Sequence, residues 1–126
     1  MAGPPRLTLA SIVLDAPDAG ALAAFYRALL GWSLRREEPD WVMIRSPDGA
    51  VGLSFQTEPD YVRPTWPAKP GEQLMMLHLD IGVDDMRAAG EHALAVGAVL
   101  ADYQPQPEVR VYLDPAGHPF CLFPLG

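Results

Sequence analysis

The chain has 126 residues, of which 49% are hydrophobic and 20% are charged, and its formal net charge is −7 at pH 7. This size and composition predict one compact domain, residues 1–126, and exclude a tandem array or a disordered tail. The acidic balance opposes polyanionic partners, so we expect binding neither to nucleic acid nor to an anionic membrane surface.

The first part of the chain predicts one strand, one helix and three further strands. Residues 7–14 form an apolar run that is typical of a strand. An amphipathic helix follows, which Asp18 caps and Gly31 ends. Its apolar positions recur at helical spacing: Leu22, Phe25, Tyr26, Leu29 and Leu30. Three strand candidates come next, at residues 33–36, 41–46 and 51–57.

The same order of signals repeats about 67 residues later. Residues 58–73 intervene and contain too many prolines for a helix or a central strand. Residues 74–83 then predict a strand, and Asp84 and Asp85 lead into a second helix that ends at Gly97. Three strand candidates complete the repeat, at residues 98–103, 109–113 and 120–124.

The repeat predicts an α+β fold of two βαβββ modules, at about residues 7–57 and 74–124, joined by a proline-rich linker at residues 58–73. A module with four strands and one helix leaves one face of its sheet uncovered. Two such modules, paired within the chain or across a homodimer, can curl into an open barrel of mixed strands. The concave side of that barrel would be a pocket.

Four segments of the sequence resemble the vicinal oxygen chelate (VOC) superfamily, the glyoxalase, bleomycin-resistance and extradiol-dioxygenase group, and above all its single-domain glyoxalase-like branch. They are residues 18–32, 78–85, 97–98 and 114–121. The resemblance implies the βαβββ barrel, a cavity for a small molecule, and a homodimer. It also implies a divalent metal held by side chains from four strands, where the metal chelates two neighbouring oxygens of a substrate. Because this fold hosts isomerases, lyases, dioxygenases and plain binding proteins, the resemblance does not select a reaction.

Carried over to this chain, the family's four ligand positions fall on Ser11, His78, Cys121 and either Ser54 or Gln56. Only His78 matches the usual His or Glu of the family. A slip of one residue in the fourth strand would instead place Leu53 and Phe55 at the fourth position. Hydroxyl, amide and thiol groups with one imidazole suit a hard divalent ion poorly, so we predict no metal cofactor and keep a divalent metal as an alternative.

His78 and Asp80 stand two residues apart on a predicted strand, so their side chains project from the same face. By the family resemblance that face lines the cavity. The pair could act as a catalytic acid and base toward a bound molecule. Alternatively, His78 is a hydrogen-bonded pocket histidine and Asp80 is a partner of the neighbouring strand.

Further residues are candidates for lining the pocket. Apolar neighbours of Cys121 favour an inert buried thiol over a nucleophile. Arg110 and Tyr112 alternate with apolar residues, and they either line the pocket or face water. The linker segment 61–67, which contains Trp66, either closes over the cavity as a lid or straps a sheet edge. The complete set of expected ligand-binding residues is Ser11, Ser54, Gln56, Trp66, Arg110, Tyr112 and Cys121.

The two other histidines are not expected to bind metal: His92 lies on the solvent side of the second helix, and His118 shapes the last turn. A single cysteine cannot form an internal disulfide, which points to a reducing cytoplasm. No apolar run approaches the ~18–20 residues of a bilayer span.

The sequence as a whole favours a cytoplasmic, homodimeric, glyoxalase-like protein that binds a small organic molecule without the usual metal. It leaves open whether the protein transforms that molecule by acid-base chemistry at His78 and Asp80. One alternative is a bleomycin-resistance-like protein that sequesters a cationic drug, which the negative charge would favour. A second is a divalent-metal-dependent lyase or isomerase.

Overall fold

The computed structural model describes residue 3 and residues 5–126; residues 1, 2 and 4, which the expected domain also covers, lie outside this part. The elements of the first half are β1 (Ile12–Ala16), α1 (Ala19–Leu30), β2 (Ser33–Glu38), β3 (Trp41–Arg45) and β4 (Gly52–Thr57). Those of the second half are β5 (Leu79–Val83), α2 (Met86–Ala95), β6 (Val99–Leu100), β7 (Arg110–Leu113) and β8 (Pro119–Pro124). Both halves therefore follow the order strand, helix, strand, strand, strand.

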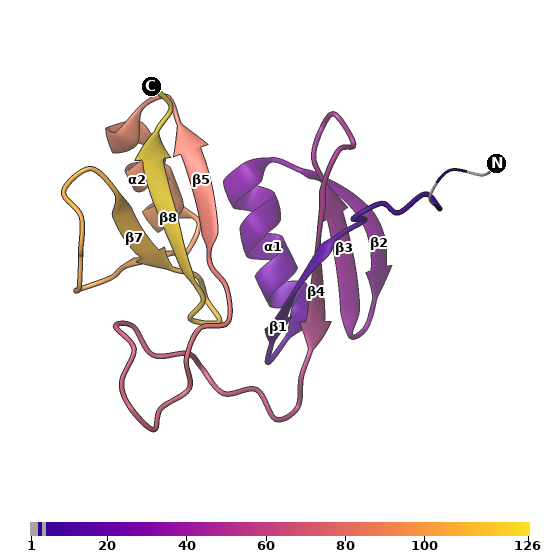
Figure 1. The fold of residues 1–126 in the computed structure, drawn as a ribbon, viewed down its shortest axis with the longest axis horizontal. Helices are drawn as coiled ribbons and strands as arrows, with labels where there is room; N and C mark the ends of the chain where they lie inside the picture. The colour runs from indigo at the N-terminus through magenta and orange to yellow at the C-terminus, as the bar shows by residue number, and fades with distance from the viewer. Residues whose placement is uncertain (1–2, 4) are drawn as a thin grey trace.

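The strands form two separate four-stranded sheets with the same topology. The N-terminal sheet has the order β1-β4-β3-β2, and the C-terminal sheet has the order β5-β8-β7-β6. In each sheet the first strand of the module pairs in parallel with its last strand, and the other neighbours are antiparallel. Figure 1 shows two open sheets that do not close into one barrel, with α1 drawn between them. The predicted α+β fold of two βαβββ modules is confirmed.

Helix α1 begins and ends at the residues that the sequence indicates. The side chain of Asp18 accepts hydrogen bonds from the backbone N–H groups of Gly20 and Ala21, which satisfies donors that have no partner inside the helix. Gly31 ends the helix with a φ of 73°, a left-handed conformation in which glycine carries no steric cost, and its N–H donates to the Arg27 carbonyl.

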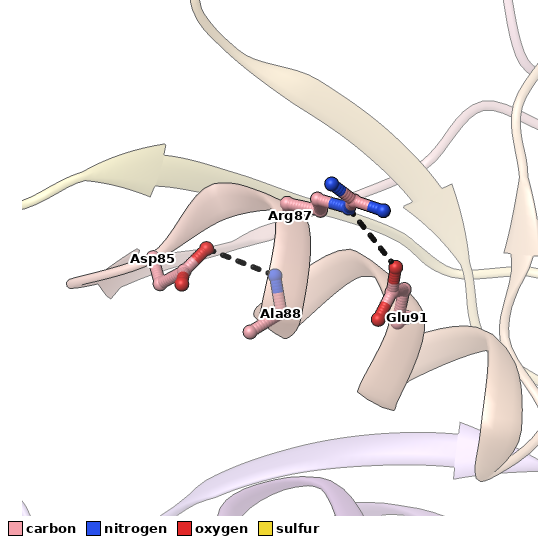
Figure 2. A network of polar contacts seen from close by, with 4 residues as sticks. All are labelled: Asp85, Arg87, Ala88 and Glu91. Carbon is pink, nitrogen blue, oxygen red and sulfur yellow. Dashed lines mark hydrogen bonds and ion pairs between the residues drawn. The ribbon is translucent and has the colours of Figure 1, made fainter.

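Helix α2 is capped in the same way but buries less. The carboxylate of Asp85 accepts a hydrogen bond of 3.0 Å from the N–H of Ala88 (Figure 2). One turn along the exposed face, Arg87 and Glu91 form an i, i+4 ion pair of 3.3 Å. Neither α1 nor α2, the two helices of the described residues, is long and apolar enough to cross a membrane.

One hydrophobic core joins the two modules. Tyr26 on α1 is fully buried, and its ring stacks on Phe55 of β4 at a centroid distance of 5.6 Å. The adjacent Phe25 packs against Phe120 of β8, at 6.0 Å, across the boundary between the modules. Because the helix-facing sides of both sheets contribute to this core, the uncovered faces of the two sheets point away from it.

Two predicted strands begin later than their apolar patterns do. β1 begins at Ile12 and β5 at Leu79, whereas residues 7–11 and 74–78 are not paired with any described strand. Their pattern allows an extended conformation, but a strand also needs a neighbour whose backbone accepts and donates its hydrogen bonds. Likewise, the strand expected at residues 98–103 shortens to Val99–Leu100. The linker at residues 58–73 contains no helix or strand, as predicted.

Candidate functional site

The uncovered face of the N-terminal sheet carries a small polar cluster, which we call the serine cluster: Ser11, Ser54 and Gln56. In β4, Leu53 and Phe55 pack into the core beside α1, so Ser54 and Gln56, which alternate with them, face the other side. The slipped register is thereby excluded. Ser11 Oγ lies 2.6 Å from Ser54 Oγ, and this hydrogen bond brings two of the expected ligand-binding residues together.

The uncovered face of the C-terminal sheet carries a second group, the His-Asp-Cys cluster, formed by His78, Asp80 and Cys121. Asp80 on β5 pairs directly with Cys121 on β8, so their side chains share one face. His78 Nε2 lies 3.2 Å from Asp80 Oδ1. One ligand atom from each of the three residues lies within 4.8 Å of the others.

The electrostatics of this cluster put the carboxylate at its centre. Burial raises the pKa of the Cys121 thiol, and the negative charge of Asp80 and a hydrogen bond to its carboxylate raise that pKa further. A carboxylate beside a thiol stabilises the protonated form, so Cys121 is a poor nucleophile here. His78 and Asp80 remain 40% and 62% exposed, so both can reach a bound molecule. The arrangement suits proton transfer by the imidazole and not attack by the sulfur.

Two expected pocket residues lie on the opposite face of the C-terminal sheet. The ring of Tyr112 is only 7% exposed and stacks on Phe120 in the core, at 5.7 Å. Arg110 shares its face, and its Nη1 donates to the Pro107 carbonyl at 3.1 Å. Strand alternation therefore directs Arg110 and Tyr112 toward α2, away from the His-Asp-Cys cluster.

Trp66 connects the linker to the second module through a hydrogen bond and an aromatic contact. Its indole Nε1 donates to the Tyr103 carbonyl at 3.0 Å, and the two rings lie 5.8 Å apart. This contact lies at the loop between β6 and β7 rather than at either polar cluster. The strap interpretation of the linker, rather than the lid, agrees with this position.

The remaining histidines make contacts between the modules that sequence reasoning missed. His92 Nε2 lies 3.1 Å from the Ala28 and Leu29 carbonyls, at the end of α1. His118 shapes the last turn as expected, because its N–H donates to Asp114, but its Nε2 also lies 2.7 Å from the Asp15 carbonyl. Neither contact has a local signal, because each partner is more than 60 residues away.

The four positions of the family's metal quartet are divided between two faces that point apart. Within the described chain, no hydrogen bond or ion pair joins the serine cluster to the His-Asp-Cys cluster. The quartet also offers hydroxyl and amide oxygens where a hard cation prefers carboxylates, so these residues do not fit such an ion. The His-Asp-Cys cluster alone offers nitrogen, oxygen and sulfur ligands, a set that Zn²⁺ accepts.

Residues 11–123 match the family described as the glyoxalase-like domain. The chain belongs to this glyoxalase-like family. The match covers both modules and the linker, so the resemblance seen in four sequence segments extends to the whole βαβββ repeat. A search of curated proteins found no match.

Solved structures share the glyoxalase-like fold at low sequence identity. A glyoxalase/bleomycin resistance protein/dioxygenase family enzyme from Burkholderia phytofirmans PsJN is 18% identical, with a TM-score of 0.71 over 95% of this chain and 100% of that one. TnmS3, an antibiotic binding protein from Streptomyces sp. CB03234, is 16% identical, with a TM-score of 0.62 over 97% and 98%. Lactoylglutathione lyase from Agrobacterium tumefaciens is 19% identical, with a TM-score of 0.62 over 97% and 96%. The TM-scores establish the shared fold and, at these identities, the fold alone; the neighbours include both a binding protein and a lyase.

Proposed function

We propose that this glyoxalase-like protein acts as a homodimer that binds a small organic molecule between two chains and moves a proton on it. The observation that carries the proposal is the separation of the two polar clusters on faces that point away from one core. In a single chain both clusters lie on the sides of the sheets away from the core, and His78 and Asp80 remain 40% and 62% exposed. Placing the N-terminal sheet of one copy against the C-terminal sheet of another would enclose both clusters in one cavity.

The exposed apolar residues that precede β1 support a second copy. Leu7 and Leu9 are 89% and 71% exposed. This segment carries a strand pattern without a paired neighbour in the described chain. Contact with another copy would bury these side chains, which is favourable by about 25 cal/mol for each Å² of apolar surface removed from water.

The proposed chemistry rests on His78. Its imidazole, half exposed and hydrogen-bonded to the carboxylate of Asp80, would remove a proton from a carbon next to a carbonyl and return it to a neighbouring atom. Asp80 would orient the ring, and Cys121, which donates to Asp80, would hold the carboxylate in place. Ser11 from the partner sheet, which is half-buried, would donate to an oxygen atom of the substrate, and the fully buried Ser54 would hold the Ser11 hydroxyl in place through their hydrogen bond.

Deuterium exchange tests the proton transfer without a known substrate. Hydroxyacetone in D₂O, followed by NMR, should lose its carbon-bound protons faster with the protein than without it. His78→Gln and Asp80→Asn should each lower this rate at least about tenfold, within the range of general acid-base catalysis. Asp102→Asn, which removes an exposed charge elsewhere, is the matched control. Exchange that persists in the double variant of His78 and Asp80 would rule out this mechanism.

A mixture of two inactive variants tests the shared site. His78→Gln damages the C-terminal face, and a Ser11→Ala/Ser54→Ala double variant damages the N-terminal face. A mixed dimer would combine an intact N-terminal face from one chain with an intact C-terminal face from the other. Activity should therefore reappear on mixing and unfolding-refolding the two variants, and it should not reappear if each chain encloses its own site.

A metal-dependent lyase or isomerase is the second candidate, and the His-Asp-Cys cluster favours it. These residues would supply three of the four ligands of a tetrahedral Zn²⁺, and a bound ion would polarise a carbonyl. Metal analysis of protein purified without chelator, together with Zn²⁺ titration by calorimetry, tests this function. One ion for each chain, lost in His78→Ala, would support it, and binding unchanged in that variant would rule it out.

A further inference from the structure

A groove of about 280 Å³ lies beside the linker, between β1 and the segment that leads into β5. Three parts of the chain form it: the strand residues 13–15, the linker residues 58–64 and the lead-in residues 73–77. His118 closes one end. None of the serine or His-Asp-Cys cluster residues lines this groove, although Val13 and Asp15 pair with Ser54 and Gln56 and therefore share the sheet face of the serine cluster.

The charged groups of the groove are all acidic. Asp15, Glu58 and Asp60 contribute carboxylates, and none of the described lining residues is Lys or Arg. The nearby guanidinium of Arg63 is directed to the last turn of the protein, where its Nη1 donates to the Pro115 carbonyl at 3.1 Å. The groove therefore presents negative charge that no lining cation neutralises, and this charge is complementary to a cation.

The ring of His118, another lining residue, is held in place by contacts of its Nε2. Its Nε2 lies 2.7 Å from the Asp15 backbone carbonyl and 3.3 Å from the hydroxyl of Tyr61. The Tyr61 hydroxyl in turn donates to the Ala116 carbonyl at 2.7 Å. These contacts hold the ring of His118 and do not engage the carboxylates of Asp15, Glu58 or Asp60; Glu58 Oε1 accepts one hydrogen bond of 3.1 Å, from the backbone N–H of Asp60.

The walls of the groove are apolar and adaptable. Four consecutive residues, Leu74, Met75, Met76 and Leu77, line one side. Unbranched methionine side chains adjust to ligands of different shapes, which suits a binding surface. Val62, which is 60% exposed, and Pro64 contribute from the linker. At about 280 Å³ the space lies near the lower limit of small-molecule sites, so it suits a compact ligand.

We propose that this groove binds a small organic cation, with its ammonium or guanidinium group against Asp15, Glu58 and Asp60 and its apolar body along residues 74–77. The carboxylates provide charge-assisted hydrogen bonds, and the methionine and leucine side chains cover the apolar part. The ligand class is thus a primary amine or guanidine that carries a short alkyl or aryl chain.

Methyl NMR on protein with labelled methionines measures binding and locates it in one experiment. Hexylammonium is the probe, and hexanol and hexanoate are the neutral and anionic matches. Met75 and Met76 should shift on titration with hexylammonium, whereas Met43 on β3 and Met86 on α2, which lie outside the groove, should not. The binding should weaken with added salt. Equal affinity for hexanol or hexanoate, or shifts confined to Met43 or Met86, would overturn the proposal.

Charge removal supplies the second readout. Asp15→Asn/Asp60→Asn should weaken hexylammonium binding at least about tenfold, since charge-assisted hydrogen bonds are about twice as strong as neutral ones. Asp102→Asn, an exposed carboxylate outside the groove, should leave the affinity unchanged. If another copy of the chain fills the groove instead, the methyl signals of Met75 and Met76 will shift with protein concentration but not with hexylammonium, and the proposal fails. Hydroxyacetone exchange is a separate assay, so an absence of exchange would contradict the proposed proton transfer without affecting the measured binding of hexylammonium.

Discussion

The hydroxyl of Tyr26 donates a hydrogen bond of 2.7 Å to Oδ2 of Asp114, and this bond ties the helix of the first module to the last turn of the second. Both side chains are almost completely buried. The other carboxylate oxygen of Asp114 accepts hydrogen bonds from the backbone N–H groups of Ala116 and His118. Burial next to this carboxylate raises the pKa of Tyr26, so the phenol remains a donor at every ordinary pH.

Removal of that hydroxyl should destabilise the protein. In Tyr26→Phe the ring still fills the core, but Asp114 Oδ2 loses its buried donor, which costs about 1–3 kcal/mol of unfolding free energy. Urea unfolding measures the change. Tyr103→Phe is the matched control. Because the Tyr103 ring is 48% exposed, loss of its hydroxyl should change the free energy of unfolding little. Equal stabilities for the two variants would contradict a stabilising role of the bond between modules.

The pH dependence of stability should differ in sign between two aspartates. Burial raises the pKa of Asp114 above its ordinary value of 3.8, so the folded state holds this proton more tightly than the unfolded chain does. Its contribution to stability is therefore present below pH 3.8 and is lost as pH rises through the raised pKa. The stability of the wild type relative to Asp114→Asn should rise as pH falls from neutral toward about pH 4.

Asp48 provides the opposite case on the surface. A hydrogen bond from Ser46 holds the pKa of its carboxyl below 3.8, so the folded state favours the ionised form. Stability from this group is present above pH 3.8 and is lost as pH falls through the lowered pKa. The wild type should therefore lose stability relative to Asp48→Asn only at strongly acidic pH. Thermal unfolding of all three proteins from about pH 3 to pH 7 tests both signs.

The reactivity of Cys121 should report on Asp80. Because the charge and hydrogen bond of Asp80 raise the pKa of the thiol, Asp80→Asn should lower that pKa and increase the rate of alkylation severalfold at mildly alkaline pH. Iodoacetamide labelling followed by mass spectrometry measures the rate at the single cysteine. Asp84→Asn, outside the cluster, should alkylate like the wild type. A rate unchanged by Asp80→Asn would show that the carboxylate of Asp80 does not control the reactivity of the Cys121 thiol.

Two glycine substitutions within helices should have opposite effects. A Cβ on Gly90 would lie 2.5 Å from the hydroxyl oxygen of Tyr112, whose ring is held by its stack on Phe120. Gly90→Ala should therefore destabilise the protein by about 1–3 kcal/mol, the usual cost of overpacking. A Cβ on Gly20 meets only Asp18 Oδ1, at 3.4 Å. Gly20→Ala should be neutral or stabilising by up to about 1 kcal/mol. Melting temperatures of both variants check the difference.

The sequence alone determined the two modules and their helices, because the signals involved act over a few residues. Asp18 and Gly31 delimit α1 through backbone groups of adjacent turns. Alternation within β4 likewise separates Ser54 and Gln56 from Leu53 and Phe55, although only the core packing decided which pair faces inward. The same reasoning predicted strands at residues 7–11 and 74–78, which lack a paired neighbour in the described chain.

Only the tertiary structure decided which distant residues meet. Tyr26 and Asp114, 88 positions apart, belong to two separate sequence segments, and no periodicity relates them. Asp80 meets Cys121 because β5 pairs with β8 in one particular register. The serine cluster and the His-Asp-Cys cluster lie on different sheets, on the sides that face away from the core, because the other sides of both sheets pack into one core. Local propensity describes each segment, whereas the mutual placement of the sheets depends on how their side chains fill one interior.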